Sequence, residues 1–346
     1  MTPESSYIRA QAQLHHAYLL GLQLMVSANK EAAVVGEWMF KLFRRQHLEK
    51  FLSSFEKLGL TKLPHAVACA QYHVLSNNIG GVGVEYMFEN DRKAWVRFRY
   101  PRWMYAGPTL CGIPIEVSRG FLEGWYAHNG VSLKNSRLGF VCVSEDMTGE
   151  FGFCGYFKEF DAELADHERL QFARGELPPI FDASLQPVLP AAQWNEERLA
   201  KANRNYALDF FRNAIVALVD TLGQSETEAL AGRAARLIGL QYLQEMLEIT
   251  GSKDGDLADA ADYLERMMLG MDDRMSTTHS TGAPLIELKQ EDPRIVRGLT
   301  GRDRLVVLNC WMQLWAGAMS SYRAMKSLDW ELKPDSIQWR LTELQR

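Results

Sequence analysis

The sequence predicts an α+β protein with two similar halves, each made of helices packed on short antiparallel β-hairpins. Three observations support this fold class. Segments with apolar residues at three- and four-residue steps alternate with segments of alternating, aromatic-rich character. The order of helix, hairpin, helix and hairpin occurs once before residue 172 and again after residue 195. Between them lies a proline-rich stretch without hydrophobic periodicity.

The first half begins with residues 1–60, whose periodicity predicts helices ending at Gly59. A helix starting near Pro64 follows and stops at the Asn- and Gly-rich residues 77–81. Residues 82–100 are predicted to form a hairpin and residues 113–130 a helix. A second hairpin spans 137–160 and turns at the polar residues 145–150.

The second half repeats this order. Helices are predicted at 195–223, 226–249, 256–268 and 303–325, and hairpins at 275–289 and 328–344. We expect the helix at 226–249 to correspond to the helix that starts near Pro64, with the acidic helix 256–268 as an addition. The helices before the final hairpins share a small motif, Phe-Leu-Glu-Gly at 121–124 and Leu-Trp-Ala-Gly at 314–317.

These patterns divide the chain into four parts. Residues 1–60 are N-terminal helices, and residues 61–172 are the first α+β repeat, which holds the candidate site. Residues 173–194 are a proline-rich linker, and residues 195–346 are the second repeat.

Composition narrows the class of function. The formal net charge is −5, and without a basic run a nucleic-acid partner is not expected. No long uninterrupted apolar segment or signal-peptide pattern is present, so no membrane partner is expected. Five cysteines fit no disulfide framework. We therefore expect a cytoplasmic protein with a small-molecule substrate, and a homodimer is compatible with this composition.

Several residues of the first repeat carry a resemblance to known families. They are Tyr100–Pro101 with Trp103, Cys111 before a helix, Gly-Phe-Leu-Glu-Gly-Trp at 120–125, and Cys154 in a closing strand. With these residues, the segment 55–160 resembles the 4-vinyl reductase domain and the related aminothiazoline-carboxylate (ATC) hydrolase family. The chain departs from that pattern at Tyr100, where a Cys is usual, and at Pro114, near where the hydrolases carry an Asp. The resemblance implies a small-molecule pocket between sheet and helices and hydrolysis of a cyclic C=N bond.

His65, Cys69 and His73 recur every four residues, so they lie on one face of the predicted helix. Three interpretations are open: core packing, a Cys–His acid–base pair, and a metal site completed by other segments. The outer two residues lie about 12 Å apart along a helix axis, so three ligands for one ion from this helix alone are unfavourable. We retain His73 as a candidate catalytic residue.

The helix at 113–130 carries further candidates. Glu116, Arg119 and Glu123 follow one side, with Trp125 and His128 after them. This arrangement is either a solvated charged face or a site in which a glutamate is the general base and Arg119 binds a substrate carboxylate. Trp125 and His128 would contribute to substrate binding.

Arg102, Trp103 and Tyr105 precede this helix and suit an anion or a planar ring. Cys111 stands just before the helix start, where the helix dipole favours a thiolate, so it is the preferred nucleophile. A buried structural role is the alternative for this cysteine.

Together, these residues predict a hydrolase acting on a C=N or amide bond of a small carboxylate-bearing molecule. Cys111, Glu116, Glu123 and His73 are the candidate catalytic residues. One alternative is a non-catalytic sensor of a small molecule, and another is a metalloenzyme using His and Glu of the first half. The sequence requires no cofactor, although a divalent metal is possible.

Overall fold

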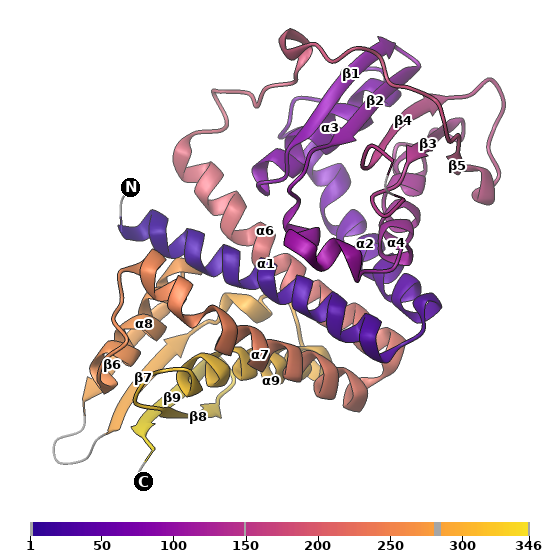
Figure 1. The fold of residues 1–346 in the computed structure, drawn as a ribbon. Coiled ribbons are helices and arrows are strands. Elements are labelled where there is room, and N and C mark those ends of the chain that lie inside the picture. Colours follow the sequence, from indigo (N-terminus) through magenta and orange to yellow (C-terminus); the bar gives the residue numbers. More distant parts are fainter. Residues whose placement is uncertain (1–2, 149, 280–284, 345–346) are drawn as a thin grey trace. The chain divides into compact units, whose positions relative to one another are not determined.

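The computed structural model of the protein describes residues 3–148, 150–279 and 285–344. The chain divides into two units, each considered by itself below. The central unit comprises Ser27–Leu199, and the terminal unit comprises Met1–Val26 and Ala200–Arg346. Each unit holds helices and one mostly antiparallel sheet (Figure 1), so the predicted α+β class is confirmed.

The central unit is built around a five-stranded sheet with the order β1-β2-β4-β3-β5. All neighbours pair antiparallel except β3 and β5. Its helices are α2 (Ala32–Phe55), α3 (His65–Ile79), α4 (Glu116–Gly124) and the single turn α5 (Asn129–Ser132). Its strands are β1 (Val84–Asn90), β2 (Lys93–Phe98), β3 (Leu138–Ser144), β4 (Cys154–Glu159) and β5 (Leu170–Phe172).

The terminal unit holds a four-stranded antiparallel sheet with the order β6-β7-β9-β8. Its helices are α7 (Gln224–Thr250), α8 (Leu257–Gly270) and α9 (Gly301–Ser320), together with most of α1 (Pro3–Asn29) and α6 (Glu196–Leu222). Its strands are β6 (Arg274–His279), β7 (Leu285–Glu291), β8 (Lys326–Leu332) and β9 (Ser336–Glu343).

The two units repeat one topology. The strand order β1-β2-β4-β3 matches β6-β7-β9-β8, and a helix connects the two hairpins in each case. Helix α3 packs on β1, β2 and β4, and helix α8 packs on the equivalent strands β6, β7 and β9. The expected match between the helix near Pro64 and the helix at 226–249 is therefore wrong, since α8 occupies that place and α7 corresponds to α2.

The shared glycine motif has a packing reason. Helix α4 lies against α2, and a Cβ at Gly124 would come 2.6 Å from the carbonyl oxygen of Phe40. Helix α9 lies against α7, and a Cβ at Gly317 would come 2.0 Å from the carbonyl oxygen of Arg236. In each unit, glycine thus permits two helix backbones to approach more closely than any side chain allows.

Strand β3 positions the polar residues of the central unit. All its residues from Leu138 to Ser144 are buried, so both faces of this strand are covered. A cluster of buried side chains forms the core here, and Phe160 and Ala173 pack against it. Its members are Met87, Trp95, Val141, Val143, Cys154 and Tyr156. The strand ends at Ser144, so the acidic residues that follow begin a turn at the edge of this core.

Candidate functional site

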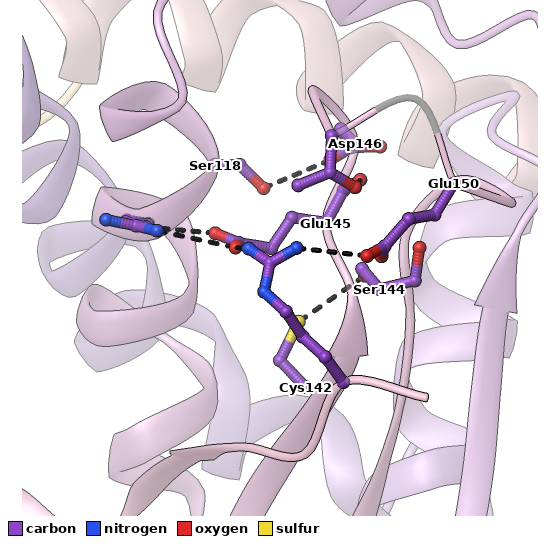
Figure 2. A network of polar contacts seen from close by, with 9 residues as sticks. Ser118, Cys142, Ser144, Glu145, Asp146 and Glu150 are labelled. Atoms are coloured by element: carbon purple, nitrogen blue, oxygen red, sulfur yellow. Dashed lines mark hydrogen bonds and ion pairs between the residues drawn. The ribbon is translucent and has the colours of Figure 1, made fainter. Parts of the chain in front are cut away.

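Two acidic side chains of the β3–β4 turn, Glu145 and Asp146, are buried. Nη1 of Arg102 donates hydrogen bonds to both carboxylate oxygens of Asp146, at 2.8 and 2.9 Å. The hydroxyl groups of Ser118 and Tyr100 also donate to Asp146, and Figure 2 shows the Ser118 contact. The aspartate therefore joins helix α4, the turn and the segment after β2.

Glu145 holds a second set of contacts, also seen in Figure 2. Nε of Arg119 lies 3.0 Å from one of its oxygens, and Nη2 of Arg174 lies 2.5 Å from the other. Arg174 also reaches Glu150, at 3.1 Å. Arg102 and Arg119, both candidate substrate ligands, are thus bound to protein carboxylates. Because three guanidinium groups face three carboxylates, this cluster is balanced in charge.

Of the remaining candidates near Arg102, Tyr105 packs against its side chain. The guanidinium carbon lies 4.3 Å from the centre of the Phe98 ring and 5.0 Å from that of Tyr105. Tyr105 is buried, and burial, with Asp146 nearby, raises the pKa of its hydroxyl. Trp103 is half-buried in a short 3₁₀ turn. The structure therefore gives Tyr105, with Phe98, a place in the packing around an ion pair.

A second polar cluster lies in the core around Asn129. Its amide nitrogen lies 3.0 Å from Nε2 of His73, which stacks on Tyr126 with ring centroids 3.9 Å apart. Burial lowers the pKa of His73 well below its ordinary value and raises the pKa of the Cys69 thiol. A neutral, buried imidazole and a protonated, buried thiol suit packing better than proton transfer or nucleophilic attack.

His47 extends this cluster toward the end of α4. Its Nδ1 lies 2.7 Å from a guanidinium nitrogen of Arg44, and burial, with the charge of Arg44, lowers the pKa of His47 to about 3. The Trp125 ring meets the imidazole edge-on at 5.6 Å, and the His128 ring lies 6.3 Å away. Trp125 and His128 therefore pack around His47. Among the described residues, no group of three or more His, Cys, Asp or Glu is placed to hold a metal ion.

Cys111 borders a cavity. It is exposed, whereas Cys69, Cys142, Cys154 and Cys310 are buried, and all five are free thiols. The cavity measures about 260 Å³ and is lined by Ser27, Lys30, Ala32 and residues 111–114. The loop between α1 and α2 thus brings a lysine side chain to the same small cavity as an accessible thiol.

Glu116 lies close to this cavity. It is half-buried in the first turn of α4, and its Cβ would be 3.3 Å from a Cβ built at Gly36 of α2. Gly36 stands four residues after Ala32, which lines the cavity, so Glu116 is one helical turn from the cavity wall. Glu123, two turns further along α4, lies at the surface, and the loss of part of its hydration there raises the pKa of its carboxyl group.

Sequence reasoning missed the residues that organise both clusters. Glu145 and Asp146 read as turn residues, although the uninterrupted apolar run of β3 before them is a sign of burial. Asn129 and His47 carry no motif, and the partners His73 of Asn129 and Trp125 of His47 are distant in sequence. Lys30 also carries no motif, and only the folded chain brings it to the cavity that Cys111 lines.

Comparison with known proteins adds no assignment. No protein-family model matches the chain, and no curated protein matches its sequence. Over the described residues, no helix is both long and apolar enough to cross a membrane.

Proposed function

We propose that the central unit is a hydrolase-like domain that acts on a C=N or amide bond of a small carboxylate-bearing molecule. The observation that carries this proposal is the exposed Cys111 thiol in a cavity of about 260 Å³ that Lys30 also lines. A cavity of this size suits a small ligand, and an ammonium group is a suitable partner for its carboxylate. In this proposal Lys30 binds the substrate carboxylate, a role predicted from the sequence for Arg102 or Arg119.

The chemistry follows from these positions. For an amidine-type bond, the sulfur of Cys111 bonds to the carbon, the π electron pair moves to nitrogen, and the thiol proton reaches that nitrogen through Glu116. The remaining nitrogen then forms a C=N bond to the carbon, its proton passes through Glu116 to the leaving nitrogen, and the C–N bond breaks with loss of the amine. One water hydrolyses the carbon–sulfur bond and returns the thiol, so that the net products are an amide and an amine.

Alkylation and turnover test the proposal. Iodoacetamide should label Cys111 in the folded protein much faster than the four buried cysteines. Small cyclic amidine carboxylates, with 2-aminothiazoline-4-carboxylate as the first, should slow that labelling and be hydrolysed. Cys111→Ala should abolish turnover, and Lys30→Met should raise KM more than it lowers kcat. Lys57→Met, an exposed lysine that does not line the cavity, is the control.

Two results would overturn the proposal. Turnover that survives in Cys111→Ala would exclude the thiol as the nucleophile. Protection of Cys111 without turnover of any carboxylate in the panel would indicate a binding protein, the second function that the sequence suggests.

Free thiols suit a reducing compartment, so we also propose a cytoplasmic location. The homodimer suggested by the sequence is tested by the mass of the protein in solution.

A further inference from the structure

A second, larger cavity opens at the start of α3 and shares no lining residue with the cavity at Cys111. It measures about 640 Å³ and is formed by two chain segments and one strand residue. The lining residues are Lys62, Leu63, Pro64, His65, Lys134, Asn135, Ser136, Arg137 and Glu159. Two lysines, an arginine and a histidine thus meet a single acidic side chain.

That acidic side chain is already bound. The amide nitrogen of Asn135 donates to one oxygen of Glu159 at 3.0 Å, and Arg137 reaches the other at 3.3 Å. Within the part of the chain that the structure describes, the ammonium groups of Lys62 and Lys134 have no ion-pair or hydrogen-bond partner. The cavity therefore carries positive charge that protein carboxylates do not neutralise.

The conformation of Lys134 is a further observation. Its φ is 54°, in the left-handed region that glycine and asparagine adopt at least cost. Lys134 closes the turn after α5, where its backbone N–H bonds to the carbonyl of Val131. Since glycine is the usual residue at such a position, a lysine there places an ammonium group in the cavity lining at a cost of about 1 kcal/mol or more.

The backbone adds to the same charge. Helix α3 is fifteen residues long, and Pro64 at its start provides no side-chain cap. The first amides of a helix have no intrahelical acceptor and carry partial positive charge. Pro64 and His65 line the cavity, so this uncapped end of α3 lies at the cavity with the two lysines.

We propose that this cavity binds the phosphate group of a small molecule. Two unneutralised ammonium groups suit a dianion better than a single carboxylate, and helix amides suit phosphate oxygens. The proposal does not depend on hydrolysis at Cys111, because neither Cys111 nor Lys30 lines this cavity.

Calorimetric titration of the full chain with inorganic phosphate and with glycerol phosphate tests the proposal. Lys62→Met and Lys134→Met should each weaken binding about tenfold, which corresponds to about 1.4 kcal/mol. Lys57→Met, an exposed lysine outside the cavity, and Cys111→Ala should bind as the wild type does. Tighter binding of glycerol phosphate would identify a phosphorylated metabolite, and equal binding would identify free phosphate.

Lys134→Gly is the most informative variant, because it removes the ammonium group and also the strain of a non-glycine residue at a positive φ. It should raise or preserve the melting temperature while weakening phosphate binding as much as Lys134→Met does. A purely structural lysine would not separate the two measurements in this way. The proposal would be overturned if phosphate binding were unchanged in Lys62→Met, Lys134→Met and Lys134→Gly, or if neither probe bound.

Discussion

Arg102 and Asp146 form an ion pair in which one guanidinium nitrogen lies 2.8 and 2.9 Å from the two carboxylate oxygens, with both side chains buried. Removal of one partner from such a pair leaves an uncompensated charge in the core. The pair therefore makes the segment after β2 and the β3–β4 turn depend on each other for stability.

Arg102→Met should lower the free energy of unfolding by about 3–5 kcal/mol, as measured by urea denaturation. Arg92→Met is the control, because Arg92 and Asp161 form an exposed pair and its loss should cost less than about 1 kcal/mol. The double variant Arg102→Met with Asp146→Leu should recover part of the loss, since neither charge of this pair then remains in the core. Equal effects of Arg102→Met and Arg92→Met would contradict this role.

Replacement of two glycines of α7 by alanine should change the stability of the protein in opposite directions. A Cβ at Gly239 would come 1.9 Å from the carbonyl oxygen of Leu314, so Gly239→Ala must push α9 away and should destabilise by about 1–3 kcal/mol. A Cβ at Gly232 meets only the side chain of Gln313, at 3.5 Å, so Gly232→Ala should stabilise by up to about 1 kcal/mol. Thermal unfolding of both variants checks the pair, and loss of stability in both would argue against close helix contact as the cause.

The buried imidazole of His47 should make stability fall in mild acid. In the unfolded chain the group binds a proton near pH 6.5, whereas burial, with the charge of Arg44, lowers its pKa in the folded state to about 3. The unfolded state thus gains protons first, and stability is lost as the pH falls below about 6.5, by at most about 1.4 kcal/mol per pH unit. Denaturation between pH 7 and 5 should show a shallower slope for His47→Gln, and an unchanged slope would exclude this contribution.

Asp273 should make stability fall as the pH rises, which is opposite to the effect of His47. Burial raises its pKa to about 7, although the backbone N–H of Arg294 and the amide of Gln290 both donate to its oxygens. The folded state keeps a proton that the unfolded chain loses near pH 4, so this stability is present in acid and declines as the pH rises from about 4 to 7. Asp273→Asn should remove that decline in denaturation midpoints across this range. The same decline in the variant would assign it to another group.

The sequence predicted the hairpins well because each is a local pattern of alternating residues bounded by a polar turn. The correspondence between halves was shifted by one helix for a physical reason. Helices α1 and α2 are separated only by Lys30 and Glu31, with no glycine or proline between them, so they read as one helical region. Three helices precede the first hairpin in each half, α1 to α3 and α6 to α8. Because α1 and α2 read as one region, the sequence matches α3 with α7 instead of α8.

The site was less predictable because burial depends on contacts between distant segments. Arg102, Arg119 and Trp125 have residue types typical of ligand binding, but their partners Asp146, Glu145 and His47 come from elsewhere in the chain. No local pattern shows that these charges are satisfied internally. Cys111 was predicted from its place before a helix, whereas the lysine beside its cavity depends on the loop between α1 and α2.

The repeated strand order makes each unit a reference for the other. Glycine at the close helix crossing occurs in both units, as Gly124 and Gly317, so the shared architecture demands it. Helix α3 carries His65, Cys69 and His73, but its counterpart α8 has no histidine or cysteine. If one ancestral half was duplicated, these side chains mark where the copies diverged, and a half-length chain lacking them would retain everything that this strand order requires.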